Sequence, residues 1–467
     1  MQPKSTINLI YLSLIILTAT IGGFLFGFDT AVISGTIGFV KKQYGMAPLM
    51  EGWFVSSALL GCMIGVAISG KLGNTLGRKK VMLLSAFLFV ISAWGCAFAQ
   101  DAVVLIVFRL IGGVGIGVAS AICPMYIAEL SPSQLRGKLV TFYQLAITIG
   151  ILVAYFSNAK IQTSLAIALP TSGWVDLLFV KEVWRGMFAI GIIPAVVFLL
   201  MLMLIPESPR WLALKNRTAE AEKILTKISN VEYAKVEMEG IQNSFKDETV
   251  TKLTDLFKGA YKKPMAIGIL LAALSQFSGI NAIIYYGPSI LEAAGFKLGD
   301  ALGGQVTIGI VNTLFTFVAI YFVDRIGRKP LLLWGIGGAV LSLLFASVLF
   351  ITNLSNGWMV LMPIIFFIAC FSFSFGAVTW VVISEIFPTK VRSEAVAIST
   401  VSLWIANWVV GQFFPLLLHN YGPAFTFFIF ALCSAYAFFL SWKKIPETKG
   451  QSLEDIEEFW CLQSASN

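Results

Sequence analysis

Apolar residues dominate the chain in long continuous runs, and short polar or charged segments separate them. A run of about 20 apolar residues is long enough to cross a bilayer as a helix, which satisfies its own backbone hydrogen bonds. We predict twelve such spans, at residues 8–35, 50–72, 80–99, 102–128, 139–158, 184–205, 263–291, 302–323, 330–352, 359–386, 393–416 and 423–442. The first run exceeds the roughly 7–15 apolar residues of a signal peptide, so we expect it to be retained.

The longest polar segment, residues 206–262, divides the spans into six plus six and contains a helical pattern from Thr218 to Ser229. The sequence therefore predicts an all-α polytopic membrane protein with two six-helix bundles. The bundles occupy residues 1–205 and 263–442, joined by a linker with short helices at 206–262 and followed by a tail at 443–467.

Composition supports this class, because 57% of the 467 residues are hydrophobic and only 12% are charged. Soluble domains average about 25% charged residues, so a soluble enzyme and a nucleic-acid-binding protein are excluded. The net charge of +8 comes from Lys and Arg in alternate polar segments, including both ends of the chain, which places both termini in the cytoplasm. With one histidine, His419, and no C-x-x-C pair, we expect no metal site and no cofactor.

The two halves repeat three local patterns. They share a G-R-K after the second span of each half, a Glu and an Arg seven residues apart after the fourth, and Pro-Glu after the sixth. The paired segments are 76–80 and 326–330, Glu129/Arg136 and Glu385/Arg392, and 206–208 and 446–448. Such a repeat predicts a central site that opens to each side in turn.

Ten motifs occur in order: G-G-F-L-F-G-F-D-T-A-V-I-S-G (22–35), G-R-K-K (77–80), R-L-I-G-G-V-G-I-G (109–117), P-M-Y-I-A-E-L-S-P-S-Q-L-R-G (124–137), Q-L-A-I-T-I-G (144–150), P-E-S-P-R-W (206–211), Q-F-S-G-I-N-A-I-I-Y-Y (276–286), D-R-I-G-R-K (324–329), W-V-V-I-S-E-I-F-P (380–388) and P-E-T-K-G (446–450). With these motifs the chain resembles a sugar porter of the major facilitator superfamily, from about residue 20 to residue 455. The resemblance implies a monomeric transporter that works by alternating access.

Asp29 is the only carboxylate well inside a predicted span, and Arg109 is the only basic residue well inside one. A charge at membrane depth costs roughly 2.5–3.5 kcal/mol on insertion scales and needs a partner. Both residues fall in the outer half of their spans, so we predict that they meet. They form either a proton carrier, in which protonation of Asp29 weakens its contact with Arg109, or a permanent ion pair that only joins two helices. The resemblance favours the carrier, since proton-coupled porters have an acid at this position and uniporters generally do not.

Charged residues also cluster at the cytoplasmic ends of the spans. They can act simply as topology signals, but the resemblance implies salt bridges that close the inner side. The residues are Arg78, Glu129 and Arg136 in the first half, Asp324, Arg328, Glu385 and Arg392 in the second, with Glu207 and Glu447 extending the two networks.

Central amides and aromatic residues are the candidates for binding sugar. Amides donate and accept hydrogen bonds without a buried charge, and aromatic faces cover the C–H surface of a sugar. Alternatively, each amide only joins two helices. The candidates are Gln144, Ser275, Gln276, Asn281, Asn312 and Asn407, with Phe26, Tyr286, Trp380 and Trp404 as aromatic walls.

Two positions depart from the usual sugar-porter pattern. Ser275 stands where many members have a second glutamine before Gln276, and Leu403 stands where many have an amide before Trp404. Because a site built around a hydroxyl rejects analogues that lack it, the loss of these groups shifts substrate preference. We expect a deoxysugar, a ketose or a polyol as substrate, or a wider pocket.

Three functional hypotheses follow. The first is a symporter that imports a monosaccharide together with H⁺, the second is a facilitative sugar uniporter, and the third is a sugar sensor on a transporter scaffold. An enzyme has no support, because no nucleophile–base set or cofactor motif is present. Short outer loops and a short tail suggest a bacterial inner membrane, and no nucleic-acid partner is expected.

Overall fold

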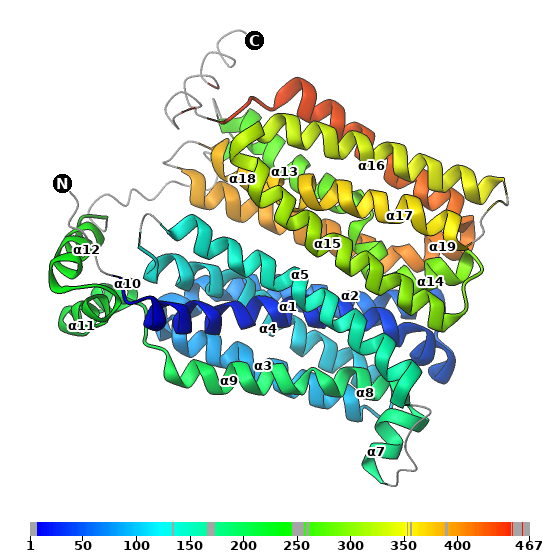
Figure 1. The fold of residues 1–467 in the computed structure, drawn as a ribbon, viewed down its shortest axis with the longest axis horizontal. Coiled ribbons are helices and arrows are strands. Elements are labelled where there is room, and N and C mark those ends of the chain that lie inside the picture. The colour runs from blue at the N-terminus through cyan, green and yellow to red at the C-terminus, as the bar shows by residue number, and fades with distance from the viewer. Residues whose placement is uncertain are drawn as a thin grey trace. The chain divides into compact units, whose positions relative to one another are not determined.

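The computed structural model describes residues 7–132, 135–165, 173–244, 256–257, 261–352, 354, 357–387, 391–449, 451 and 460. Within these ranges the chain is helical and contains no strand (Figure 1). Among the described residues, eleven helices are long and apolar enough to cross a membrane. The all-α membrane fold predicted from the sequence is confirmed.

The first six spans are α1 (Leu9–Tyr44), α2 (Pro48–Leu76), α3 (Arg78–Phe98), α4 (Ala102–Leu130), α5 (Arg136–Lys160) and the consecutive helices α8 (Val183–Ile190) and α9 (Ile192–Leu204). All six fall where the apolar runs predict them, although α1 continues nine residues beyond its predicted end. Between α5 and α8 lie the short helices η1 (Ile161–Leu165), α7 (Trp174–Asp176) and η2 (Leu177–Lys181).

The second set of spans is α13 (Lys262–Phe277) with α14 (Ile280–Ala293), α15 (Leu298–Ile326), α16 (Arg328–Ile351), the series α17 (Gly357–Phe371), η5 (Ser372–Gly376) and α18 (Val378–Glu385), and α19 (Arg392–Lys444). Helix α19 contains the last two predicted spans, joined at a kink where Gly422 has φ 77°. Pro423 follows directly, and a proline cannot donate the backbone hydrogen bond that would straighten the kink. The twelve predicted spans thus correspond to eleven long helical segments.

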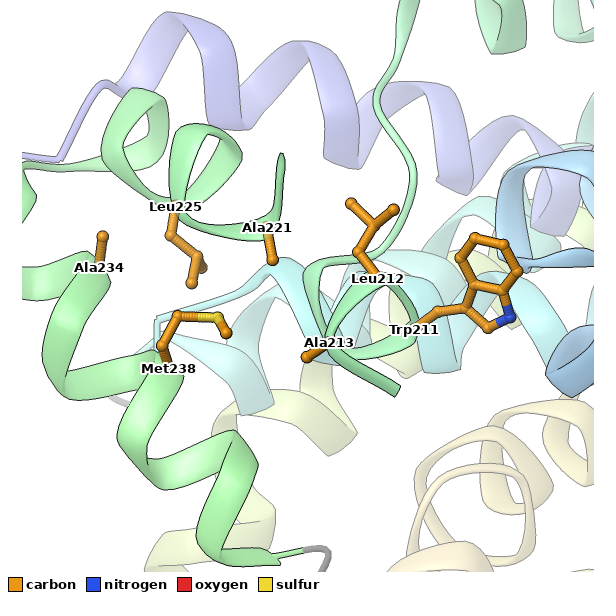
Figure 2. Packing of buried hydrophobic residues seen from close by; sticks show 7 residues of the cluster. All are labelled: Trp211, Leu212, Ala213, Ala221, Leu225, Ala234 and Met238. Carbon is orange, nitrogen blue, oxygen red and sulfur yellow. The ribbon is translucent and has the colours of Figure 1, made fainter. Parts of the chain in front are cut away.

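The linker forms three short helices, α10 (Pro209–Leu214), α11 (Thr218–Ile228) and α12 (Val231–Ser244). Helix α11 confirms the helical pattern expected from Thr218. The three helices share a small core of buried apolar side chains, shown in Figure 2: Trp211, Leu212, Ala213, Ala221, Leu225, Ala234 and Met238. The linker also contacts the residue before α1, because the backbone N–H of Asn8 donates to the carbonyl of Ile228, the last residue of α11, at 2.8 Å.

Large apolar side chains remain exposed along the spans, including Leu200, Leu341 and Phe439, each more than half exposed. A soluble protein rarely tolerates many contiguous exposed apolar residues. Hydrocarbon chains are as apolar as these side chains, so a bilayer accommodates them.

The residues separate into two compact units by their contacts. Unit 1 comprises residues 1–30, 60–154 and 170–249, and unit 2 comprises residues 31–59, 155–169 and 250–467. Unit 2 therefore holds all of the second half together with the ends of α1 and α5 and the start of α2, which belong to the first half by sequence. The two predicted halves are defined by the order of the spans along the chain. The two units are defined by contacts between residues, so their boundaries differ from those of the halves.

Candidate sugar and proton site

Asp29 on α1 and Arg109 on α4 form an ion pair in unit 1. Arg109 Nη1 lies 2.9 Å from Asp29 Oδ2 and also donates to the Asp29 carbonyl at 3.2 Å. The Arg109 side chain is 2% exposed, whereas the Asp29 side chain is 16% exposed. The structure brings together the two charges that the sequence predicts to meet, and it leaves the carboxylate the more accessible of the two.

The surroundings of Arg109 are mostly apolar. Its guanidinium lies over the Phe188 ring, 5.9 Å from the ring centre, and its Nε has no hydrogen-bond partner within the described part of the chain. Charge-assisted hydrogen bonds are stronger in such surroundings than in water, because little solvent competes for them. Asp29 therefore supplies most of what stabilises Arg109 here, and a change in its charge state acts directly on the arginine.

Ser275, Gln276 and Asn281 form a continuous chain of hydrogen bonds in unit 2. Gln276 Nε2 donates to Ser275 Oγ at 3.0 Å, and Asn281 Nδ2 donates to Gln276 Oε1 at 2.6 Å. Helices α13 and α14 are separated by Gly279, whose φ of 89° lies in the left-handed region that favours glycine. The break anticipated from Ser278-Gly279 is present, and it lets two amides five residues apart touch.

The other two amides of unit 2 join helices. Asn312 Oδ1 on α15 accepts a bond from the Ser372 hydroxyl of η5 at 2.8 Å. Asn407 on α19 pairs with the Tyr285 hydroxyl of α14, with Asn407 Nδ2 donating at 3.2 Å. In this conformation Asn407 fits the helix-joining interpretation, which the sequence left open. Gln144 on α5 is partly buried and belongs to unit 1.

The aromatic candidates differ in accessibility. Tyr286 is 1% exposed, stacks on Phe414 at 4.9 Å and donates its hydroxyl hydrogen to Gly411 O. Its ring therefore packs inside unit 2, contrary to the expectation of an open sugar-facing wall, because α14 turns it toward α19. Trp380 on α18 is 36% exposed, Trp404 is buried, and Phe26 on α1 is partly buried. Among the aromatic candidates for the sugar site in unit 2, Trp380 thus has the most free surface.

Two bidentate ion pairs occupy equivalent places in the two halves. Arg78 Nη2 lies 2.8 Å from Glu129 Oε1, and Arg328 Nη2 lies 3.0 Å from Glu385 Oε1, while each arginine also donates through Nε. Two parallel hydrogen bonds of this kind fix the relative orientation of the arginine and the carboxylate and also strengthen the ion pair. Each pair joins helices of one unit.

Three further charged residues depart from the predicted clusters or cannot be placed. Arg136 lies 3.7 Å from Glu237 on α12 and is not paired with Glu129, because it stands at the start of α5, beside the linker helices. Arg392 Nε and Nη2 are buried without a hydrogen-bond partner within the described ranges. The side chain of Asp324 lies outside the described residues.

Glu207 and Glu447 bind backbone amides in place of the salt bridges expected for them. Glu207 Oε1 accepts from the N–H groups of Arg78 and Lys79 at 2.9 and 3.1 Å. Glu447 accepts in the same way from Arg328 and Lys329, both at 3.0 Å. The first N–H groups of a helix have no partner within the helix and carry a partial positive charge, so a carboxylate is a favourable cap.

A family model described as "Sugar (and other) transporter" matches residues 15–460. The arabinose-proton symporter of Bacillus subtilis is 42% identical over 450 residues, covering 96% of this chain and 95% of the relative. The D-xylose-proton symporter of Escherichia coli K12 is 37% identical, with 97% and 96% covered. The chain belongs to the sugar transporter family.

Solved structures of one relative have the same fold as this sugar transporter. The inward open conformation of the xylose transporter XylE from E. coli matches with a TM-score of 0.83 and 35% identity, covering 96% of this chain and all of that one. The XylE structure bound to 6-bromo-6-deoxy-D-glucose matches with a TM-score of 0.79 and 36% identity, covering 97% and 100%. This agreement identifies the fold as that of the major facilitator superfamily.

The transporter's two carboxylate caps depend on glycine. Gly77 precedes α3 with φ 97°, and a Cβ there would lie 2.3 Å from Glu207 Oε2. Non-glycine residues held in such backbone regions cost of order 1–3 kcal/mol. We expect Gly77→Ala to lower the free energy of unfolding by about that amount, measured by thermal melting in detergent. Gly137→Ala is the control, because no atom lies within 4 Å of a Cβ at that position. Equal melting temperatures for the two variants would contradict the role of Gly77.

Some polar residues of this transporter were missed by sequence reasoning. Glu51 is buried at the start of α2, where its Oε2 lies 2.7 Å from Lys41 Nζ. Glu51 lies only one residue inside a predicted span, so the sequence does not distinguish it from the charged residues that commonly end a span. Gln412, inside the eleventh span, binds the Ser56 hydroxyl at 2.6 Å, a contact between residues 356 apart that no local pattern reveals.

Proposed function

We propose that this chain is a secondary active transporter that imports a monosaccharide together with a proton by alternating access. The observation that carries the proposal is the buried Asp29–Arg109 pair, in which the acid is partly accessible and the arginine is not. The arabinose and xylose transporters to which the chain is similar are named proton symporters, which supports the same coupling here.

Protonation of Asp29 provides the coupling step. The charged carboxylate holds Arg109 by an ion pair and a hydrogen bond, and the neutral acid has only the weaker hydrogen bond to offer. Release of Arg109 lets α1 and α4 move relative to each other, which we assign to the transition between outward-facing and inward-facing states. A proton is thus required before the sugar-loaded carrier turns.

For the sugar we propose binding through Gln276 and Asn281, with Asn312 and Trp380 completing the part of the site in unit 2. The hydrogen bonds between Ser275, Gln276 and Asn281 keep these polar groups satisfied without substrate. A sugar hydroxyl can replace each of those bonds with one of similar strength. Gln144, Phe26, Trp404 and Asn407 remain proposed contributors on the family pattern.

The substrate is proposed to be a monosaccharide with altered recognition at one or two hydroxyls. Ser275 is shorter than glutamine and already bonds Gln276, and Leu403 is apolar and buried. Neither can supply the second amide that the family pattern has at these positions. A deoxysugar, ketose or polyol therefore fits the site better than an aldohexose.

We further propose that the protein works as a monomer in a bacterial inner membrane with both termini in the cytoplasm. Lysine and arginine gather in the polar segments that contain the two ends, and such segments stay inside. The ion pairs Arg78–Glu129 and Arg328–Glu385 would then lie on the cytoplasmic side and contribute to closing it.

Uptake of labelled sugars into vesicles, with and without an inward proton gradient, tests the proposal. The panel comprises glucose, xylose, galactose, arabinose, fructose, fucose and inositol. We expect at least one sugar to accumulate above its external concentration only when the gradient is imposed. Equilibration without accumulation would make the protein a facilitator, and loss of all uptake despite correct insertion would contradict a sugar substrate.

A further inference from the structure

Helix α14 contains a carbonyl group that its own helix cannot pair. Pro288 has no backbone N–H, so the carbonyl of Ile284, four residues earlier, lacks the donor that an α-helix normally provides. Buried carbonyl groups are nearly always paired, and Ile284 is buried within a membrane-spanning segment. Another part of the chain must therefore supply the bond.

Two side chains from different helices supply it. The Tyr155 hydroxyl of α5 donates to Ile284 O at 3.0 Å, and Gln305 Nε2 of α15 donates to the same oxygen at 3.2 Å. Both side chains are buried. Gln305 approaches α14 closely because residue 287 is glycine, where a Cβ would lie 1.9 Å from Gln305 Oε1.

The two donors differ in their place in the sequence. Gln305 and Ile284 both belong to the second half, so their contact joins neighbouring spans of one bundle. Tyr155 belongs to the first half, although all three residues lie in unit 2. In a carrier built from two repeated halves, contacts between segments of different halves form and break in every cycle.

We propose that Tyr155 is a positioning residue that latches α5 to the proline break of α14 and releases it when the outer side of the transporter opens. This inference rests on the proposed transport cycle and identifies a contact that controls the opening of the outer side. The latch leaves the helical bonds of α14 intact, because its acceptor is the carbonyl that Pro288 sets free. Release leaves no unpaired carbonyl, because Gln305 still donates to Ile284 O.

The role of α14 explains why such a latch matters. The helix begins one residue before Asn281, a proposed sugar ligand, and its Tyr285 bonds Asn407 on α19. A bond that fixes α14 therefore fixes part of the sugar site. The Tyr155 hydroxyl donates to the carbonyl of Ile284 and so acts on α14 through its backbone.

The test measures opening directly, without added sugar and with the proton gradient of the cells collapsed by a protonophore. Ser56 is buried against Gln412, so Ser56→Cys reports exposure of this contact to a membrane-impermeant maleimide added outside intact cells. In this background Tyr155→Phe should raise the labelling rate about fivefold, which corresponds to about 1 kcal/mol. Tyr143→Phe is the matched control, because it removes a buried hydroxyl of α5 that bonds nothing among the described residues.

A second variant is expected to change the labelling rate in the opposite direction. Among the described residues, Gln305→Leu leaves Tyr155 as the sole donor to Ile284 O. Release of the Tyr155 bond then leaves this carbonyl unpaired, so labelling should fall severalfold. A purely structural bond would leave labelling unchanged in Tyr155→Phe or shift both variants in the same direction, and either result overturns the proposal. Failure of sugar–proton coupling would appear instead in the uptake assay and leave these labelling rates as expected.

Discussion

Replacing Asp29 with asparagine is expected to abolish proton-driven accumulation of sugar while sugar exchange across the membrane continues. The amide is nearly the same size as the acid and can still accept a hydrogen bond from Arg109, but it cannot gain or lose a proton. The carrier then behaves as if permanently protonated, so it turns over without coupling. The measurement is uptake into energised vesicles beside counterflow in de-energised ones.

Asp300→Asn provides the matched control for this experiment, since Asp300 is an exposed aspartate in the first turn of α15. It should retain both accumulation and exchange. Full accumulation in Asp29→Asn would remove the proton from the role of Asp29 and leave the ion pair as a joint between two helices. Loss of exchange together with accumulation would show that the acid is needed for turnover itself.

Arg109→Leu is expected to be strongly destabilising, and addition of Asp29→Asn in the same chain should restore most of the loss. Removing one partner of a buried ion pair leaves an uncompensated charge and costs about 3–5 kcal/mol. Removing both charges takes away that penalty, because neither side chain of the double variant leaves a buried charge without a partner. Thermal melting in detergent, with the yield of folded protein, measures both variants.

The exposed ion pair Arg217–Glu220 on the linker serves as the control for the buried Asp29–Arg109 pair. Its charges lie in solvent at 2.6 Å, where an ion pair contributes little. Arg217→Leu should therefore melt close to the parent protein. A double variant as unstable as Arg109→Leu alone would contradict the stranded charge as the cause and point to lost packing of Arg109 on Phe188.

Features governed by hydropathy and by the cost of burial could be predicted from the sequence. The spans followed from the apolar runs, and the Asp29–Arg109 contact followed from the cost of leaving either charge alone in a membrane. The break before α14 followed from Ser278-Gly279, because φ 89° is accessible to glycine without strain. Each of these features depends either on local sequence or on a free-energy cost of burial so large that only one arrangement avoids it.

Features that depend on the rotation of one helix against another could not be predicted. Tyr286 was expected beside the sugar, but α14 turns its ring onto Phe414. Glu207 was expected in a salt bridge, yet a carboxylate near a helix start is satisfied equally well by amides or by an arginine, and only the path of the chain decides. The latch between Tyr155 and Ile284 links positions 129 apart, where sequence offers no pairing rule.

The paired carboxylate caps bear on how a chain of this kind could arise by duplication. Glu207 completes the first turn of α3 from just beyond the sixth span, and Glu447 does the same for α16 from just beyond the twelfth. A copied segment of six spans therefore keeps this cap only when it includes the few residues that follow the sixth span. A copy that ended at the last apolar residue would leave these amides without their carboxylate, so Glu447 after the twelfth span is the counterpart of Glu207 after the sixth.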